Sequence, residues 1–271
     1  IEVRLIQDLL KAFKDPHSLF VDWWATGVWL GSPQRKLPRA PAIYERKTKW
    51  PVREGGPELH GEWKANYSSL KDHERKVIEQ YRQEIKEGLM TVMSLREAIE
   101  LYGEELLIAA TGAIAKKGQG PDGDVRVIYD GSHGVFLNLG IKTREQARLP
   151  TAPDFKAVLA EMAEEGGEHF VLVYDVKKAH RRIPVLPSEW GRQACQVRGS
   201  AAAALQMRKA KRAAASSSSS APSGEATRLL LSDFTQEELE EDVYVNCVGT
   251  FGVTSAGYWL GRAGGAIVRV T

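Results

Sequence analysis

Apolar positions recur at helical spacing in several parts of the chain, and three of these parts begin or end at residues typical of a helix boundary. Ser94 and Glu97 have the spacing of a capping box, in which each residue binds the backbone amide of the other. Gly88 supplies a stop for the helix before it. The pattern predicts helices over residues 3–13, 69–87, 94–102 and 152–165.

Short apolar runs rich in β-branched and aromatic residues predict strands between these helices. Residues 105–111 and 125–130 flank a basic, glycine-rich turn, so we expect them to form a hairpin. The nearly continuous apolar run 169–176 predicts a strand buried on both faces. Residues 193–197 and 243–248 predict two further strands. Together these elements indicate an α+β fold.

Two segments lack such patterns. Residues 199–226 consist mainly of Ala, Ser, Lys and Arg, with five consecutive serines, which predicts a disordered insertion. Residues 1–66 predict a mostly irregular extension beyond their first helix. We expect its Trp23, Trp24 and Trp29 to belong to the core or a docking surface rather than to a base-stacking platform. The basic run 35–49 is either a nucleic-acid-binding arm or a solvated loop.

Charge is informative only locally. The formal net charge of the 271 residues is +2, which does not argue for a nucleic-acid partner. Residues 171–212, however, hold ten Lys or Arg against two acidic residues, and residues 225–242 hold seven acidic residues against one Arg. The basic segment could face a phosphate backbone, and a solvated basic surface beside an acidic linker explains the same counts.

The two cysteines, Cys195 and Cys247, lack metal-ligand spacing, and each lies in an apolar run typical of a buried position. A reducing, intracellular compartment is therefore expected, either the cytoplasm or the nucleus. No apolar run approaches the roughly 18 residues that span a bilayer, so no membrane partner is expected. The chain starts at Ile1 and stops at Thr271 inside an apolar pattern, which we interpret as two cut ends.

One carboxylate, Asp175, follows Val-Leu-Val-Tyr at the expected end of a strand, where metal ligands of α/β sites often stand. Alone, such an aspartate is more often a helix cap or a turn residue. Here Ala179 and His180 follow at the fourth and fifth positions, and Ile183-Pro184 comes next. This spacing resembles the first palm motif of retroelement reverse transcriptases.

Two further segments resemble the same family. Thr250-Phe-Gly-Val-Thr-Ser-Ala256 is similar to its Pro-Phe-Gly-Leu-x-x-Ala-Pro turn, with Thr250 and Gly257 in place of the prolines. That turn opens a small-residue helix that lies against template and nucleotide, so the resemblance implies nucleotide binding by Phe251 and Gly252. Val125-Arg-Val-Ile-Tyr-Asp130 resembles the fingers strand. The motifs occur in the family's order and cover about residues 70–271.

The first motif implies a metal and nucleotide site. Carried over by position, Asp175 would be the catalytic ligand of both Mg²⁺ ions, assisted by the carbonyl of Val176. The amides of Lys178 and Ala179 would contact the triphosphate. His180 stands where the family usually has Tyr or Phe, a ring that excludes the ribose 2′-hydroxyl.

The fingers strand implies phosphate contacts. Arg126 would grip the triphosphate, because a guanidinium pairs bidentately with phosphate oxygens and keeps its charge. Asp130 would help to orient the strand, and Asn138 also fits the family's pattern. Either Lys116 or Lys117 would supply a second phosphate contact.

The resemblance implies a right-hand polymerase with an N-terminal extension (1–66), a fingers-like region (67–168) and a partial palm (169–271). Its reaction is RNA-directed DNA synthesis from deoxynucleoside triphosphates on an RNA or DNA template-primer, with two Mg²⁺ ions and Mn²⁺ as an alternative. The family's adjacent aspartates are missing, since no Asp-Asp dipeptide occurs in the sequence. We expect a fragment that is inactive alone. The alternatives are a non-catalytic nucleic-acid-binding or degenerate retroelement remnant and an unrelated α/β binding protein.

Overall fold

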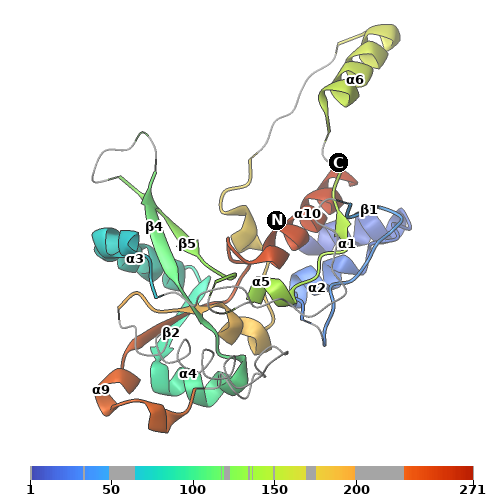
Figure 1. Ribbon diagram of the computed structural model, residues 1–271. Coiled ribbons are helices and arrows are strands. Elements are labelled where there is room, and N and C mark those ends of the chain that lie inside the picture. The colour runs from blue at the N-terminus through green and yellow to red at the C-terminus, as the bar shows by residue number, and fades with distance from the viewer. Residues whose placement is uncertain are drawn as a thin grey trace.

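The computed structural model describes residues 2–32, 34–48, 65–116, 118, 123–133, 135, 137–148, 150–168, 175–198 and 229–270. Within these residues the chain is mixed α/β with open sheets, which confirms the mixed class (Figure 1). The α-helices are α1 (Val3–Ala12), α2 (Phe20–Thr26), α3 (Ser68–Lys86), α4 (Leu95–Tyr102), α5 (Leu137–Gly140), α6 (Ala152–Glu165), α9 (Gln236–Leu239) and α10 (Thr254–Val268). The 3₁₀ helices are η1 (Gly103–Glu105), η2 (Ala179–Arg182), η3 (Pro187–Gln193) and η4 (Leu231–Asp233). The strands are β1 (Glu45–Arg46), β2 (Met90–Ser94), β3 (Ile108–Ala109), β4 (Thr111–Ala115), β5 (Val125–Tyr129), β6 (Glu145–Gln146), β7 (Ala194–Cys195) and β8 (Asp242–Asn246).

The predicted helices are present as α1, α3, α4 and α6. At the start of α4, the amide of Glu97 donates to Ser94 Oγ (3.2 Å) and the amide of Ser94 donates to Glu97 Oε2 (2.8 Å). This completes the predicted capping box. At the start of α6, the amide of Thr151 donates to Asp154 Oδ2 (2.7 Å). The local boundary signals were therefore sufficient for these helices.

The apolar side of α6 is exposed. Phe155, Val158 and Leu159 each leave more than half of their surface in contact with solvent, and α6 projects away from the other elements (Figure 1). The periodic pattern therefore predicted the helix correctly without revealing a packing partner among the described residues. None of the described helices, α6 included, is long and apolar enough to cross a membrane.

The predicted hairpin is present, but its first strand is shifted. β4 pairs antiparallel with β5, so that Thr111 faces Tyr129 and Ala115 faces Val125. The predicted first strand, 105–111, ends at the residue where β4 begins. The predicted bounds of this strand were therefore wrong. Part of it forms β3, which pairs in parallel with β7 in another sheet. The apolar run is continuous through both strands, so hydrophobicity alone did not mark where the chain changes sheets.

The largest sheet has the strand order β2-β8-β7-β3. β7 and β8 pair antiparallel, with Ala194 opposite Val245. These two strands flank the predicted insertion 199–226, so the expectation that both strands form is confirmed. The insertion itself lies outside the described residues, as do residues 169–174 of the predicted strand 169–176. The last two residues of that run are described and are not in a strand.

Aromatic side chains of the N-terminal segment pack against α10. The ring of Trp259 lies 5.2 Å from the Trp29 ring and 5.9 Å from the Phe20 ring, and its indole N–H donates to the Trp29 carbonyl (2.7 Å). Trp24 is buried and Trp23 packs against the same cluster, which confirms their predicted place in the core. The prediction of a mostly irregular extension missed α2, a two-turn helix that is too short for a clear periodic pattern.

His17 belongs to this core and makes stability depend on pH. Its ring stacks on Phe20 with 5.2 Å between ring centres and meets the Tyr44 ring edge-on at 5.7 Å. Burial, together with the positive charges of Arg262 and Arg269, lowers the pKa of His17 from 6.5 to about 4. The unfolded chain therefore binds a proton between pH 6.5 and about 4 that the folded chain does not bind.

Because of this difference, we expect the free energy of unfolding to fall by about 3 kcal/mol through His17 as the pH drops from 7 to about 4. Urea unfolding at a series of pH values measures this effect. His17→Phe keeps an aromatic ring against Phe20 and removes the titrating group, so its stability should fall less over the same range. Equal pH profiles for the two proteins would contradict the assignment.

Candidate functional site

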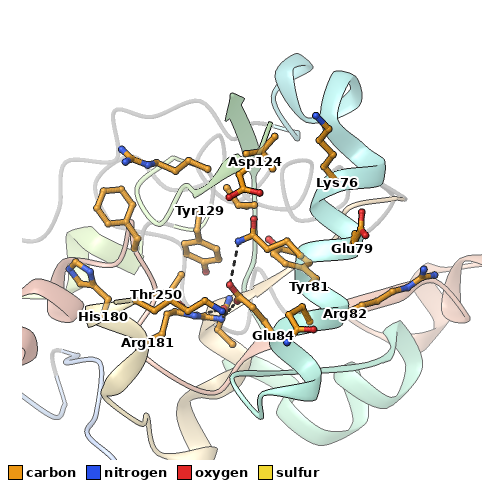
Figure 2. A pocket seen from close by; sticks show the side chains of 18 of the residues that line it. Lys76, Glu79, Tyr81, Arg82, Glu84, Asp124, Tyr129, His180, Arg181 and Thr250 are labelled. Carbon is orange, nitrogen blue, oxygen red and sulfur yellow. Dashed lines mark hydrogen bonds and ion pairs between the residues drawn. The ribbon is translucent and has the colours of Figure 1, made fainter. Parts of the chain in front are cut away.

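A cleft of about 1270 Å³ lies between α3 and the β4–β5 hairpin (Figure 2). Residues of η2 and of the turn between β8 and α10 complete its lining. Figure 2 shows Tyr81 on α3, Tyr129 on β5 and His180 on η2 around this hollow. Segments that are far apart in the sequence therefore build one cleft.

Cations dominate the lining of this cleft. Among the described residues, eight basic and three acidic side chains line it. Two of the acids are paired within the cleft, Glu84 with Arg181 and Asp124 with Lys116. A cleft lined mainly by one sign of charge concentrates ions of the opposite sign, so this cleft favours anionic ligands. The basic residues are Lys76, Arg82, Lys86, Lys116, Arg126, Lys177, Lys178 and Arg181.

A largely buried ion pair forms one wall of the cleft. The Arg181 guanidinium donates to the carboxylate of Glu84 and to Asn246 Oδ1 (2.6 Å). Arg181 thereby ties η2 to α3 and to β8. The pair has a high desolvation cost, which these charge-assisted hydrogen bonds offset. Sequence reasoning missed this contact, although Glu84 stands among the apolar positions of α3 and so carried a signal of burial.

Two of the predicted nucleotide-binding side chains are in contact. The rings of His180 and Phe251 lie 5.7 Å apart and nearly perpendicular. Burial lowers the pKa of His180, which favours its neutral form. Phe251 is mostly exposed beside it. The two rings therefore place an apolar surface at a cleft that is otherwise basic.

Gly252 forms a turn that requires glycine. Its φ of +107° lies in a region that L side chains rarely adopt, and a Cβ there would be 2.0 Å from the Tyr129 carbonyl oxygen. Asn138 Nδ2 donates to the Gly252 carbonyl (2.7 Å), and Asn138 Oδ1 accepts from the amide of Thr254 (2.8 Å). Asn138 thus joins the turn to the start of α10.

Asp130 fixes the conformation of the turn that follows β5. Its carboxylate accepts from the Tyr67 hydroxyl and from the amides of Ser132 (3.0 Å) and His133 (2.9 Å). Burial raises the pKa of Asp130, but these hydrogen bonds outweigh burial and bring the pKa below its ordinary value. The carboxylate is therefore ionised and holds the turn next to the cleft.

The predicted site residues separate into two groups. Arg126, Lys178, His180 and Phe251 line the cleft. The remaining four are not among the described residues that line it, namely Asp175, Val176, Ala179 and Gly252.

Lys178 directs the start of η2. Its φ of +54° is left-handed, which is uncommon for a residue other than glycine. Its Nζ binds Glu87 Oε2 at 2.7 Å, and this hydrogen bond lowers the pKa of Glu87. The contact joins the chain just after Asp175 to the end of α3. Of the two candidate phosphate-binding lysines, Lys116 lines the cleft and Lys117 lies outside the described residues.

The expected Mg²⁺ site is incomplete in the part of the chain that the structure describes. There, no group of three His, Cys, Asp or Glu side chains is placed to hold a metal ion. Asp175 is an exposed carboxylate. One carboxylate and one carbonyl supply fewer ligands than Mg²⁺ uses in two-ion polymerase sites, so these residues do not fit a complete site.

Comparison of the chain with known protein families gives no match, and comparison with curated proteins gives no significant match. Inferences about function therefore depend on the geometry of the cleft and on the motifs that meet there.

Proposed function

We propose that this chain forms the fingers and part of the palm of a reverse-transcriptase-like polymerase, and that its basic cleft binds the phosphates of nucleic acid and of a nucleoside triphosphate. In this proposal the Arg126 guanidinium and the backbone amide of Lys178 contact phosphates. His180 and Phe251 lie against the sugar and base. The chain alone binds these ligands without extending a primer.

The convergence of three motifs on one cleft is the observation that supports this proposal. Arg126 comes from the fingers-like strand, His180 from the segment after Asp175, and Phe251 from the glycine turn. Their side chains line the same basic surface although more than a hundred residues separate the first from the last. If the three segments resembled the family only by chance, there would be no reason for their side chains to line one cleft.

Arg126 is suited to bind a phosphate. It is exposed on β5, lines the cleft and forms no ion pair with any described residue. Its planar guanidinium can donate two parallel hydrogen bonds to phosphate oxygens. An unpaired arginine also binds a ligand without first breaking an internal contact.

Arg126→Ala is expected to weaken the binding of a labelled template-primer or of a deoxynucleoside triphosphate by about tenfold, which corresponds to one charge-assisted hydrogen bond. Fluorescence anisotropy at fixed ionic strength measures this change. Arg4→Ala removes an exposed arginine from α1 and serves as the matched control. If the two variants bind the ligand with equal affinity, the cleft is not the binding site.

Residues 1–271 alone are expected to show no primer extension with Mg²⁺ or Mn²⁺, because nucleotidyl transfer by this mechanism requires at least two carboxylates. A gel assay with a labelled primer tests this expectation. Template-dependent extension that Asp175→Ala abolishes would contradict it.

A second candidate function is nucleic-acid binding without chemistry, as in a degenerate retroelement remnant. Asp175 is not among the described residues that line the basic cleft, and this placement favours it. Under this alternative, Mg²⁺ leaves nucleotide affinity unchanged and Asp175→Asn has no effect. Under the first proposal, Asp175→Asn changes the affinity for a deoxynucleoside triphosphate. An unrelated α/β protein is indicated if neither Asp175→Asn nor Arg126→Ala alters binding.

A further inference from the structure

A second basic surface lies on and beside the β1–β6 pair of strands. We call it the basic ribbon and define it by Arg46, Lys47, Lys142 and Arg144. β1 and β6 pair antiparallel, and the amide of Lys47 donates to the carbonyl of Arg144 (3.0 Å). The fold therefore joins two basic segments that stand about a hundred residues apart in the sequence.

The charges of the basic ribbon are not neutralised internally. None of its four cations forms an ion pair with any residue that the structure describes. The neighbouring acid Glu145 is buried and already binds Arg262 at 2.7 Å. Glu45 is the remaining acid in the two strands, and it is exposed. The ribbon thus keeps an excess of positive charge on its surface.

A groove of about 320 Å³ adjoins the ribbon. Lys47 and Thr143 line one part of it, and Thr254, Gly257 and Gly261 of α10 line another. A Cβ added at Gly257 or Gly261 would meet nothing within 4 Å, so α10 leaves open space at both positions. This groove accepts a chain at close range beside the cations.

We propose that the basic ribbon and the adjoining glycine groove bind the phosphodiester backbone of a nucleic-acid strand that extends beyond the cleft. This inference rests on the proposed function, because the same strand occupies both surfaces. α10 begins directly after the turn of Phe251 and Gly252, so one helix connects the cleft to the groove. The basic run 35–49, for which the sequence left two alternatives, then acts in part as a nucleic-acid-binding arm.

A nucleic acid fits these observations better than an acidic peptide. Several cations grouped on and beside two paired strands can neutralise neighbouring phosphates, and the open space at the α10 glycines leaves room for a sugar-phosphate chain. The hydroxyl groups of Thr143 and Thr254 supply further hydrogen-bond donors at the groove.

The experiment compares labelled single-stranded RNA of roughly 8 and roughly 30 nucleotides, since the shorter length fills about one site. Anisotropy is measured at several salt concentrations. The ribbon variant Arg46→Gln/Lys47→Gln/Arg144→Gln is expected to bind the longer RNA at least about tenfold more weakly, with a salt slope reduced by about 2. Binding of the shorter RNA should stay within about twofold. The control variant Arg4→Gln/Lys11→Gln/Lys14→Gln removes equal charge from exposed positions of the N-terminal segment. It should bind the longer RNA with the affinity of the wild type.

A second variant separates binding from folding. Gly257→Ala/Gly261→Ala narrows the groove while favouring the helix, so the longer RNA should bind more weakly although thermal stability rises. Unchanged binding by both the ribbon and the glycine variants would overturn the inference. The proposed function would survive that result if Arg126→Ala still weakened binding of the shorter RNA.

The opposite failure has a different pattern. Wild-type binding by Arg126→Ala, together with weak binding by the ribbon variant, would overturn the proposed function and leave the ribbon as the binding surface. The last measurement is competition between polyglutamate and the labelled RNA. If polyglutamate competes as well as RNA at equal charge, the ribbon binds any polyanion and the nucleic-acid assignment is wrong.

Discussion

Gly252→Ala is expected to destabilise the folded chain by roughly 3–4 kcal/mol. The added Cβ would stand 2.0 Å from the Tyr129 carbonyl oxygen, which belongs to the backbone of β5 and so yields little. The positive φ of Gly252 adds strain for any L side chain. The turn or the strand must therefore move, and the hydrogen bonds of Asn138 to both sides of the turn weaken with it.

Urea unfolding measures this loss, and Gly264→Ala is the matched control on the following helix. A Cβ at Gly264 meets nothing within 4 Å, so alanine there should keep stability or raise it by about 0.5–1 kcal/mol. A Gly252→Ala protein within about 0.5 kcal/mol of the wild type would contradict the described turn. Where the variant still folds, it should also bind template-primer more weakly, because Phe251 precedes the displaced glycine.

Glu145→Ala is expected to cost about 3–5 kcal/mol of folding free energy, because it leaves a buried cation without its partner. Arg262 is only 3% exposed, and its guanidinium donates to Glu145 Oε2 at 2.7 Å. Burial already lowers the pKa of Arg262, which reflects the cost of this charge inside the protein. The amide of Ala40 also loses its acceptor, since it donates to both carboxylate oxygens of Glu145.

The same unfolding experiment tests this prediction. Glu240→Ala removes a glutamate from an exposed pair with Arg96 and should change stability by less than about 1 kcal/mol. Glu145→Gln keeps an acceptor for the Ala40 amide and should cost less than Glu145→Ala. If Glu145→Ala and Glu240→Ala cost the same, the ion pair with Arg262 is not buried as described.

Local signals explain what could be predicted. The periodicity of α3 and the capping pair of Ser94 and Glu97 act within a few residues, and the structure has both helices at the expected places. The turn at Gly252 could also be predicted locally, because a positive φ is a property of a single residue. Such features depend on the chain alone.

Contacts between distant segments explain what was missed. The apolar run through Ile108 and Thr111 was read as one strand, yet its halves pair with different partners. Glu84 was recognisable as a polar residue among apolar ones, but its partner Arg181 lies 97 positions away. Likewise, 117 positions separate Glu145 from Arg262. Pair energies of this kind depend on which charges share a buried volume, and sequence spacing does not encode that volume.

The candidate site divides in the same way. By itself, the sequence determined helices α1, α3, α4 and α6, the capping pair of Ser94 and Glu97, the glycine turn and the three motifs in their order, because each depends on local geometry or on residue type. Only the tertiary structure decided that Arg126, His180 and Phe251 line one cleft and that the basic run near Lys47 meets Arg144 beside α10. The physical reason is that long-range pairing and burial are decided jointly by segments far apart in the chain, through surfaces that exist only after folding.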